Sequence, residues 1–173
     1  MHIAYTKAPG KGDTDLLLHE AAAQLQARGY RLAGTVQINT DREKNGPCDM
    51  DVKVLPDGPV IRISQNLGRG ARGCRLNPSA LETAVAQVET SLAQGVDCLV
   101  VNKFGKHEAE GRGFRPVIVD ALSRGIPVLV GLNQLNENDF LTFAEGLAKE
   151  LEPQSPALLD WLAMAVTDSS EAA

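Results

Sequence analysis

Apolar residues recur along the chain in two alternating patterns, short continuous runs and helical spacings of three and four. The short runs, at residues 2–6, 30–37, 96–101 and 126–130, predict buried strands. The helical spacings predict helices at residues 13–28, 77–94, 113–124, 138–151 and 156–166. Because strands alternate with helices, we expect a parallel sheet with right-handed crossover connections.

Capping residues mark the ends of the first two helices. Asp13 is the predicted N-cap of the first helix, and Gly29 follows its end. Asn77 and Pro78 open the second helix, and Gly95 ends it. Between these helices, strands at residues 48–55 and 59–64 flank the turn Pro56-Asp57-Gly58, which predicts a hairpin.

The predicted fold is therefore α/β: a three-layer, mostly parallel sheet flanked by helices, with an inserted β-hairpin. A chain of 173 residues fits one domain. We expect that domain at residues 1–166, followed by a flexible tail at 167–173.

Composition narrows the function classes. The chain has 17 Lys and Arg against 22 Asp and Glu, a net charge of −5, which argues against nucleic acid as a partner. No apolar run is long enough to span a membrane and no signal peptide precedes the first strand, so we expect a cytoplasmic protein without a membrane partner. Three widely spaced cysteines argue against a disulfide framework and a structural zinc site.

The loop after the first strand resembles a phosphate-binding loop with altered residues. The pattern G-x-x-x-x-G-K-[ST] can be laid over residues 7–14, where Gly12 and Thr14 match but Asp13 replaces the lysine. An aspartate there repels phosphate, and a plain helix cap at Asp13 explains the residue equally well. The sequence thus predicts a degenerate phosphate loop, which comprises Gly10, Lys11, Gly12, Asp13 and Thr14.

The end of the third strand also departs from the usual nucleotide-binding pattern. Enzymes with a phosphate loop usually place an acidic Mg²⁺ ligand at such a strand end, but here Asn102 and Lys103 follow Val101. Because both halves of the nucleotide–Mg²⁺ machinery are altered, the sequence favours a protein without catalytic residues.

Positive charge gathers in two loop-rich segments. Residues 62–75 hold four arginines and no acid, and residues 102–115 hold four basic residues against two glutamates. Glycines between arginines allow the backbone to form an anion nest, although the same arginines could be plain solvated loop residues. The candidate anion-binding set is Arg69, Gly70, Arg72, Gly73, Cys74, Arg75, Asn102, Lys103, Lys106, Arg112 and Arg115.

Other reactive residues receive weaker assignments. Cys74 lies between Arg72 and Arg75, which favours its thiolate. His107 and Glu108 are the candidates for a metal site, but a histidine beside glutamates in a loop more often forms simple hydrogen bonds, and no metal is expected.

Three stretches, residues 63–68, 73–76 and 101–115, resemble a bacterial domain-of-unknown-function family that is distantly similar to small P-loop nucleoside-triphosphatases. The resemblance covers nearly the whole chain and implies a P-loop-NTPase-like fold. Members are often encoded near molybdate-transport genes, which implies a role in molybdenum homeostasis with molybdate or tungstate as ligand. The departures at Asp13, Asn102 and Lys103 argue against hydrolysis.

Three hypotheses follow. The first is a non-catalytic protein that binds molybdate, tungstate or a similar tetrahedral anion. The second is a nucleotide-binding NTPase with a modified phosphate loop. The third is a regulatory module whose partners are molybdate-transport or cofactor-assembly proteins, and a homo-oligomer is compatible with each of the three.

Overall fold

The computed structural model describes residues 1–40, 49–65 and 75–171 of the chain. Within them seven strands form one sheet in the order β4-β3-β2-β5-β6-β1-β7. The strands are β1 (Ile3–Thr6), β2 (Leu32–Thr40), β3 (Asp49–Val54), β4 (Val60–Arg62), β5 (Cys98–Val101), β6 (Val128–Gly131) and β7 (Lys149–Leu151). The helices are α1 (Asp13–Ala27), α2 (Pro78–Ala93), α3 (Lys106–Ala109), α4 (Arg115–Ser123), α5 (Glu137–Phe143) and α6 (Ser155–Glu171), with a 3₁₀ turn, η1, at Gln134–Asn136.

Five neighbouring strands of the sheet run parallel. β1 lies between β6 and β7, and β5 lies between β2 and β6. The hairpin predicted around Pro56 is confirmed: β3 pairs antiparallel with β4 and also with β2, so the hairpin extends the main sheet. All five parallel strands point their carboxyl ends to the same edge of the sheet, where α/β proteins bind ligands.

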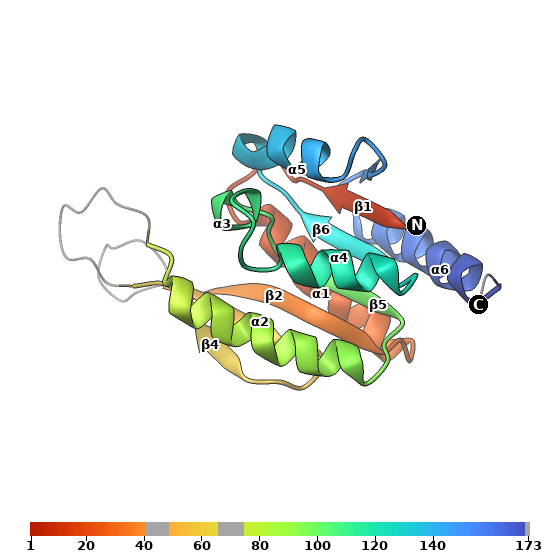
Figure 1. Cartoon of the computed structure of the whole chain (residues 1–173), viewed down its shortest axis with the longest axis horizontal. Coiled ribbons are helices and arrows are strands. Elements are labelled where there is room, and N and C mark those ends of the chain that lie inside the picture. Colours follow the sequence, from red (N-terminus) through yellow and green to blue (C-terminus); the bar gives the residue numbers. More distant parts are fainter. Residues whose placement is uncertain (41–48, 66–74, 172–173) are drawn as a thin grey trace.

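Helices cover both faces of the sheet, which confirms the predicted three layers (Figure 1). Alternate strand residues pack to opposite sides: Leu99 and Val101 contact the cluster that includes α2 and α4, whereas Cys98 and Val100 contact the cluster that includes α1 and α6. These residues are almost completely buried, which explains why the strands read as continuous apolar runs.

The predicted helix at residues 138–151 is wrong in its second half. α5 ends at Phe143, and residues 149–151 form β7, an edge strand beside β1. Glu145 and Gly146 have φ of 51° and 72°, so the backbone leaves the helical region there. The pattern missed β7 because only Leu151 of its three residues is buried.

Two further helices differ from the sequence pattern. The last helix continues through Glu171, past the predicted end at residue 166. The short helix α3 lies in a segment that was expected to be a loop. The division into a domain at 1–166 and a tail stays a prediction. In the part of the chain that the structure describes, no helix has both the length and the apolar character needed to cross a membrane.

Candidate functional site

The loop between β1 and α1 turns sharply onto the helix. Gly12 is the residue before the first helical position, with φ of 86°, a left-handed conformation that favours glycine. Asp13 is therefore the first residue of α1 and not its N-cap, and no side chain caps the helix. The hydroxyl of Thr14 accepts a hydrogen bond from the backbone N–H of Ala8 at 2.8 Å, which folds the loop back over the helix start.

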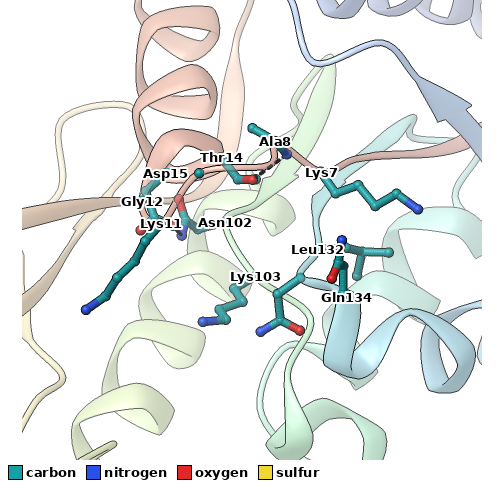
Figure 2. Close-up of a pocket in the computed structure, with 12 residues that line it drawn as sticks. Lys7, Ala8, Lys11, Gly12, Thr14, Asp15, Asn102, Lys103, Leu132 and Gln134 are labelled. Atoms are coloured by element: carbon teal, nitrogen blue, oxygen red, sulfur yellow. Dashed lines mark hydrogen bonds between the residues drawn. The ribbon is translucent and has the colours of Figure 1, made fainter.

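This loop forms one wall of a cavity of about 290 Å³, here called the loop cavity. The other walls are Asn102 and Lys103 after β5, and Leu132, Asn133 and Gln134 after β6 (Figure 2). The cavity thus lies at the carboxyl ends of three parallel strands. Gly10, Lys11, Gly12 and Thr14 of the degenerate phosphate loop all line it.

The charge on the loop cavity is positive. Among the residues that the structure describes, its lining holds Lys7, Lys11 and Lys103 against one carboxylate, Asp15. The Lys11 and Lys103 side chains are exposed, and Lys7 extends away from both (Figure 2). An anion in this cavity therefore meets two cations at the end of the sheet.

Asn102 connects β5 to α1 and β2. Its amide nitrogen donates to Oδ1 of Asp15 at 2.9 Å, and its amide oxygen accepts the backbone N–H of Gln37 at 2.8 Å. The Gln37 side chain donates to the other Asp15 oxygen at 3.2 Å. Asp15 is thereby held in position by two amide donors, one from β2 and one from the end of β5.

Lys7 is held on the far side of the loop cavity. Its ammonium group forms ion pairs with Glu137 and with Glu150, the latter at 3.2 Å. The Tyr5 hydroxyl also donates to Glu150, at 3.2 Å. Burial, with help from the Glu150 charge, raises the pKa of Tyr5. These contacts tie β1 to α5 and β7 beside the loop cavity.

The structure brings together only part of the candidate anion-binding set. Asn102 and Lys103 line the loop cavity, whereas Arg75 and Lys106 line a second cavity beside it. Arg75 also lies 3.6 Å from Asp49. Five members lie outside the described residues: Arg69, Gly70, Arg72, Gly73 and Cys74.

Arg112 and Arg115 lie apart from both cavities. Arg112 forms an ion pair with Glu110 on the exposed surface. The guanidinium carbon of Arg115 lies 4.7 Å from the ring centre of Phe143, and Arg115 also donates to the backbone carbonyl groups of Glu108 and Ala109. Both arginines therefore have partners within the protein where they stand.

His107 and Glu108 are buried in the segment that leads from β5 to α4. His107 lies 3.1 Å from Glu82, and the two Glu108 oxygens accept the backbone N–H groups of Gly105 and Phe114 at 2.9 and 3.2 Å. Burial raises the pKa of Glu108, although these backbone hydrogen bonds oppose the rise. Among the residues whose placement is described, no three His, Cys, Asp or Glu side chains gather closely enough to hold a metal ion.

The second cavity, of about 450 Å³, is here called the apolar cavity. Asn102, Lys103 and Asn133 line both cavities, so the two are adjacent. Residues of β2, β3, α2 and α3 line the apolar cavity, together with Asn133 and Asn136 beyond the end of β6. Its apolar lining residues are Met50, Val52, Ile63, Leu76, Leu81 and Phe114.

The residues do not fit a Mg²⁺-bound nucleotide in the usual manner of a phosphate loop. That ion needs oxygen ligands, and an acidic residue normally comes from the strand end. Here the strand end supplies Asn102, whose oxygen already accepts the Gln37 N–H, and the cation Lys103.

Sequence reasoning missed the partners that position this strand end. Asp15 and Gln37 were not candidates, yet they hold Asn102 in place. Asn133, shared by both cavities, also went unnoticed. The available signal was position alone, because Asn133 follows a buried strand as Asn102 does.

The parallel sheet and the glycine loop before α1 define a P-loop-NTPase-like α/β protein. Residues 3–161 match the family described as "Protein of unknown function (DUF2478)", and the chain belongs to that family. This confirms the resemblance drawn from the sequence.

A curated relative and a solved structure are also similar to the chain. The chain is 35% identical over 149 residues to "Molybdenum import ATP-binding protein ModC 2" of Bradyrhizobium diazoefficiens. The match covers 86% of this chain but spans only 17% of the relative's length. The fold is similar to that in "Solution Structure of a Human Cancer-Related Nucleoside Triphosphatase", with a TM-score of 0.60, 20% identity, and coverage of 99% of this chain and 98% of the other.

Proposed function

We propose that the protein binds a tetrahedral oxyanion in the loop cavity without hydrolysing it. The observation that carries the proposal is the pair of exposed lysines, Lys11 and Lys103, on a cavity whose lining, among the described residues, holds three lysines against the single carboxylate of Asp15. Backbone N–H groups at the start of α1 add further positive potential.

Molybdate or tungstate is the proposed ligand, with phosphate as the anion of similar shape. The relative's name refers to molybdenum import, which supports this choice among tetrahedral anions. The absence of hydrolysis is proposed because Asp13 takes the usual lysine position and Asn102 takes the usual acidic position.

Isothermal titration with molybdate, tungstate, sulfate and phosphate tests the proposal. Lys11→Gln and Lys103→Gln should each weaken binding by about tenfold to a hundredfold, because each removes a charge-assisted hydrogen bond. The matched control is Arg28→Gln, which removes the same charge from the exposed far end of α1 and should leave the affinity unchanged. No heat from any of the four anions below millimolar concentration refutes the proposal.

A nucleotide-binding NTPase with a modified phosphate loop is the second candidate. It is favoured by the position of Gly12 and Thr14 at the start of α1, directly beside the loop cavity. It predicts phosphate release from ATP or GTP that falls when Lys11 or Thr14 is replaced by alanine. No turnover by the purified protein with Mg²⁺ excludes it.

A further inference from the structure

The oxyanion proposed above occupies the loop cavity and leaves the larger apolar cavity beside it without a role. We propose that the two cavities form one binding site for an organic phosphate monoester, whose phosphate lies in the loop cavity and whose apolar body lies in the apolar cavity. This inference rests on the proposed function, because it places the charged group of the ligand on the same lysines.

Continuity is the first reason. Asn102, Lys103 and Asn133 line both cavities, so the two are direct neighbours, and a ligand of two parts could place one part in each. Lys103 lines both cavities, so its ammonium group can pair with one negative group of a ligand from either cavity. Two separate anions would have to share that lysine and would repel each other.

The size and lining of the apolar cavity give the second reason. Its volume of about 450 Å³ lies in the usual range for small-molecule sites, and such sites combine mainly apolar walls with a few polar groups. Val52, Ile63, Leu81 and Phe114 are all at least nine-tenths buried. An apolar ring placed against them would leave water at little cost to the protein.

Several polar groups on this wall already have partners inside the protein. Both Glu108 oxygens accept backbone N–H groups, His107 contacts Glu82, and both ends of the Asn102 amide are hydrogen-bonded. An apolar ligand body therefore leaves these groups paired, whereas a body rich in hydroxyl groups would find them occupied.

The test compares three probes by isothermal titration: inorganic phosphate, phenyl phosphate and ribose 5-phosphate. Phenyl phosphate should bind at least about tenfold more tightly than inorganic phosphate, because its ring is buried. Ribose 5-phosphate should bind with nearly the same affinity as inorganic phosphate. Inorganic phosphate should displace phenyl phosphate competitively, since both place their phosphate in the loop cavity.

Filling the apolar cavity should separate the two parts of the site. Leu76→Trp, at a half-buried lining position outside the regular elements, should abolish the advantage of phenyl phosphate and leave inorganic phosphate binding within about twofold of the parent chain. Met50→Phe on β3 is a second variant in case the first does not fold. Leu147→Trp is the matched control, because Leu147 is exposed and lines neither cavity.

The outcomes distinguish this inference from the proposed function. If inorganic anions bind but phenyl phosphate gains nothing, or if Leu76→Trp and Met50→Phe leave its advantage intact, the inference fails and the proposed function stands. If phenyl phosphate binds through the apolar cavity and inorganic anions do not bind, the proposed function fails in its inorganic form. If none of the probes binds, both fail.

Discussion

Replacement of Asn102 by alanine should lower the free energy of unfolding by more than the loss of a single hydrogen bond would. Asn102 is 4% exposed and joins three elements: its oxygen accepts the backbone N–H of Gln37 on β2, and its nitrogen donates to Asp15 on α1. Alanine removes both hydrogen bonds and leaves the buried Gln37 N–H without its acceptor.

The magnitude follows from these two losses. A buried donor without a partner costs about 1–3 kcal/mol, and a hydrogen bond to a charged group contributes about 1.5–3 kcal/mol. The second loss is discounted, because Asp15 is half-buried, regains water and keeps its hydrogen bond from the Gln37 side chain. We therefore expect Asn102→Ala to lower the free energy of unfolding by about 2–4 kcal/mol.

Urea denaturation followed by tryptophan fluorescence measures this change. Trp161 is the single tryptophan of the chain and is 8% exposed on α6, so its emission reports loss of the core. A loss below about 1 kcal/mol would refute the assigned role of Asn102, because it would mean that neither hydrogen bond contributes to stability.

A charge swap tests the same network from the other side. Asn102→Asp places a carboxylate oxygen where the amide nitrogen now lies 2.9 Å from Asp15, and two carboxylates that close cannot both be ionised. The folded variant then holds a proton that the unfolded chain has released, so its stability falls as pH rises from about 4 to 7. Adding Asp15→Asn supplies a new amide donor and should restore most of the lost stability. A double variant no more stable than Asn102→Asp would contradict this account.

Three further predictions concern positions outside this network. Gly34→Ala should lower the free energy of unfolding by more than about 3 kcal/mol, because a Cβ would lie 1.8 Å from the Val100 carbonyl oxygen. Gly29→Ala, also at positive φ but with nothing within 4 Å of the added Cβ, should lower it by about 1 kcal/mol. Urea denaturation midpoints of the two variants test this difference. The Cys98 thiol should resist iodoacetamide at pH 8 in the folded protein, since burial raises its pKa far above the ordinary value. Peptide mapping measures the modification, and a Cys98 that reacts as fast in the folded protein as in urea would contradict this expectation. Glu108→Gln should lower stability by about 1–3 kcal/mol at pH 7, because its amide nitrogen would face a backbone N–H. Since burial raises the pKa of Glu108, the parent chain should lose stability as pH rises just above the ordinary carboxyl range, and urea titrations of the variant should lack that slope.

The sequence predicted the buried strands well because each carries its signal within itself. The residues of β5 and β6 are all buried, and an unbroken apolar run is the direct consequence. β7 gave no such signal, because Lys149 and Glu150 are exposed and the strand is defined by its pairing with β1, which lies 145 residues away in the chain. Edge strands of this kind depend on tertiary contacts that local periodicity does not contain.

In the candidate site, too, residues that follow local rules could be predicted and long-range contacts could not. Lys11 and Lys103 could be placed from local rules, because one follows the first strand and the other follows β5. The contact between Asp15 and Asn102 joins residues 87 positions apart, and no spacing rule links them. Charge counting grouped Arg112 with the anion set, but a count cannot show that Glu110 already pairs with it.

The two edges of the sheet have a consequence for self-association. β4 and β7 are three residues long, and their outer positions include the charged residues Arg62, Lys149 and Glu150. Short, charged edges offer little template for a strand of another molecule, so growth of the sheet from chain to chain is disfavoured. If the protein assembles into a homo-oligomer, the two sheet edges of the described part of the chain are therefore poor surfaces for the contact.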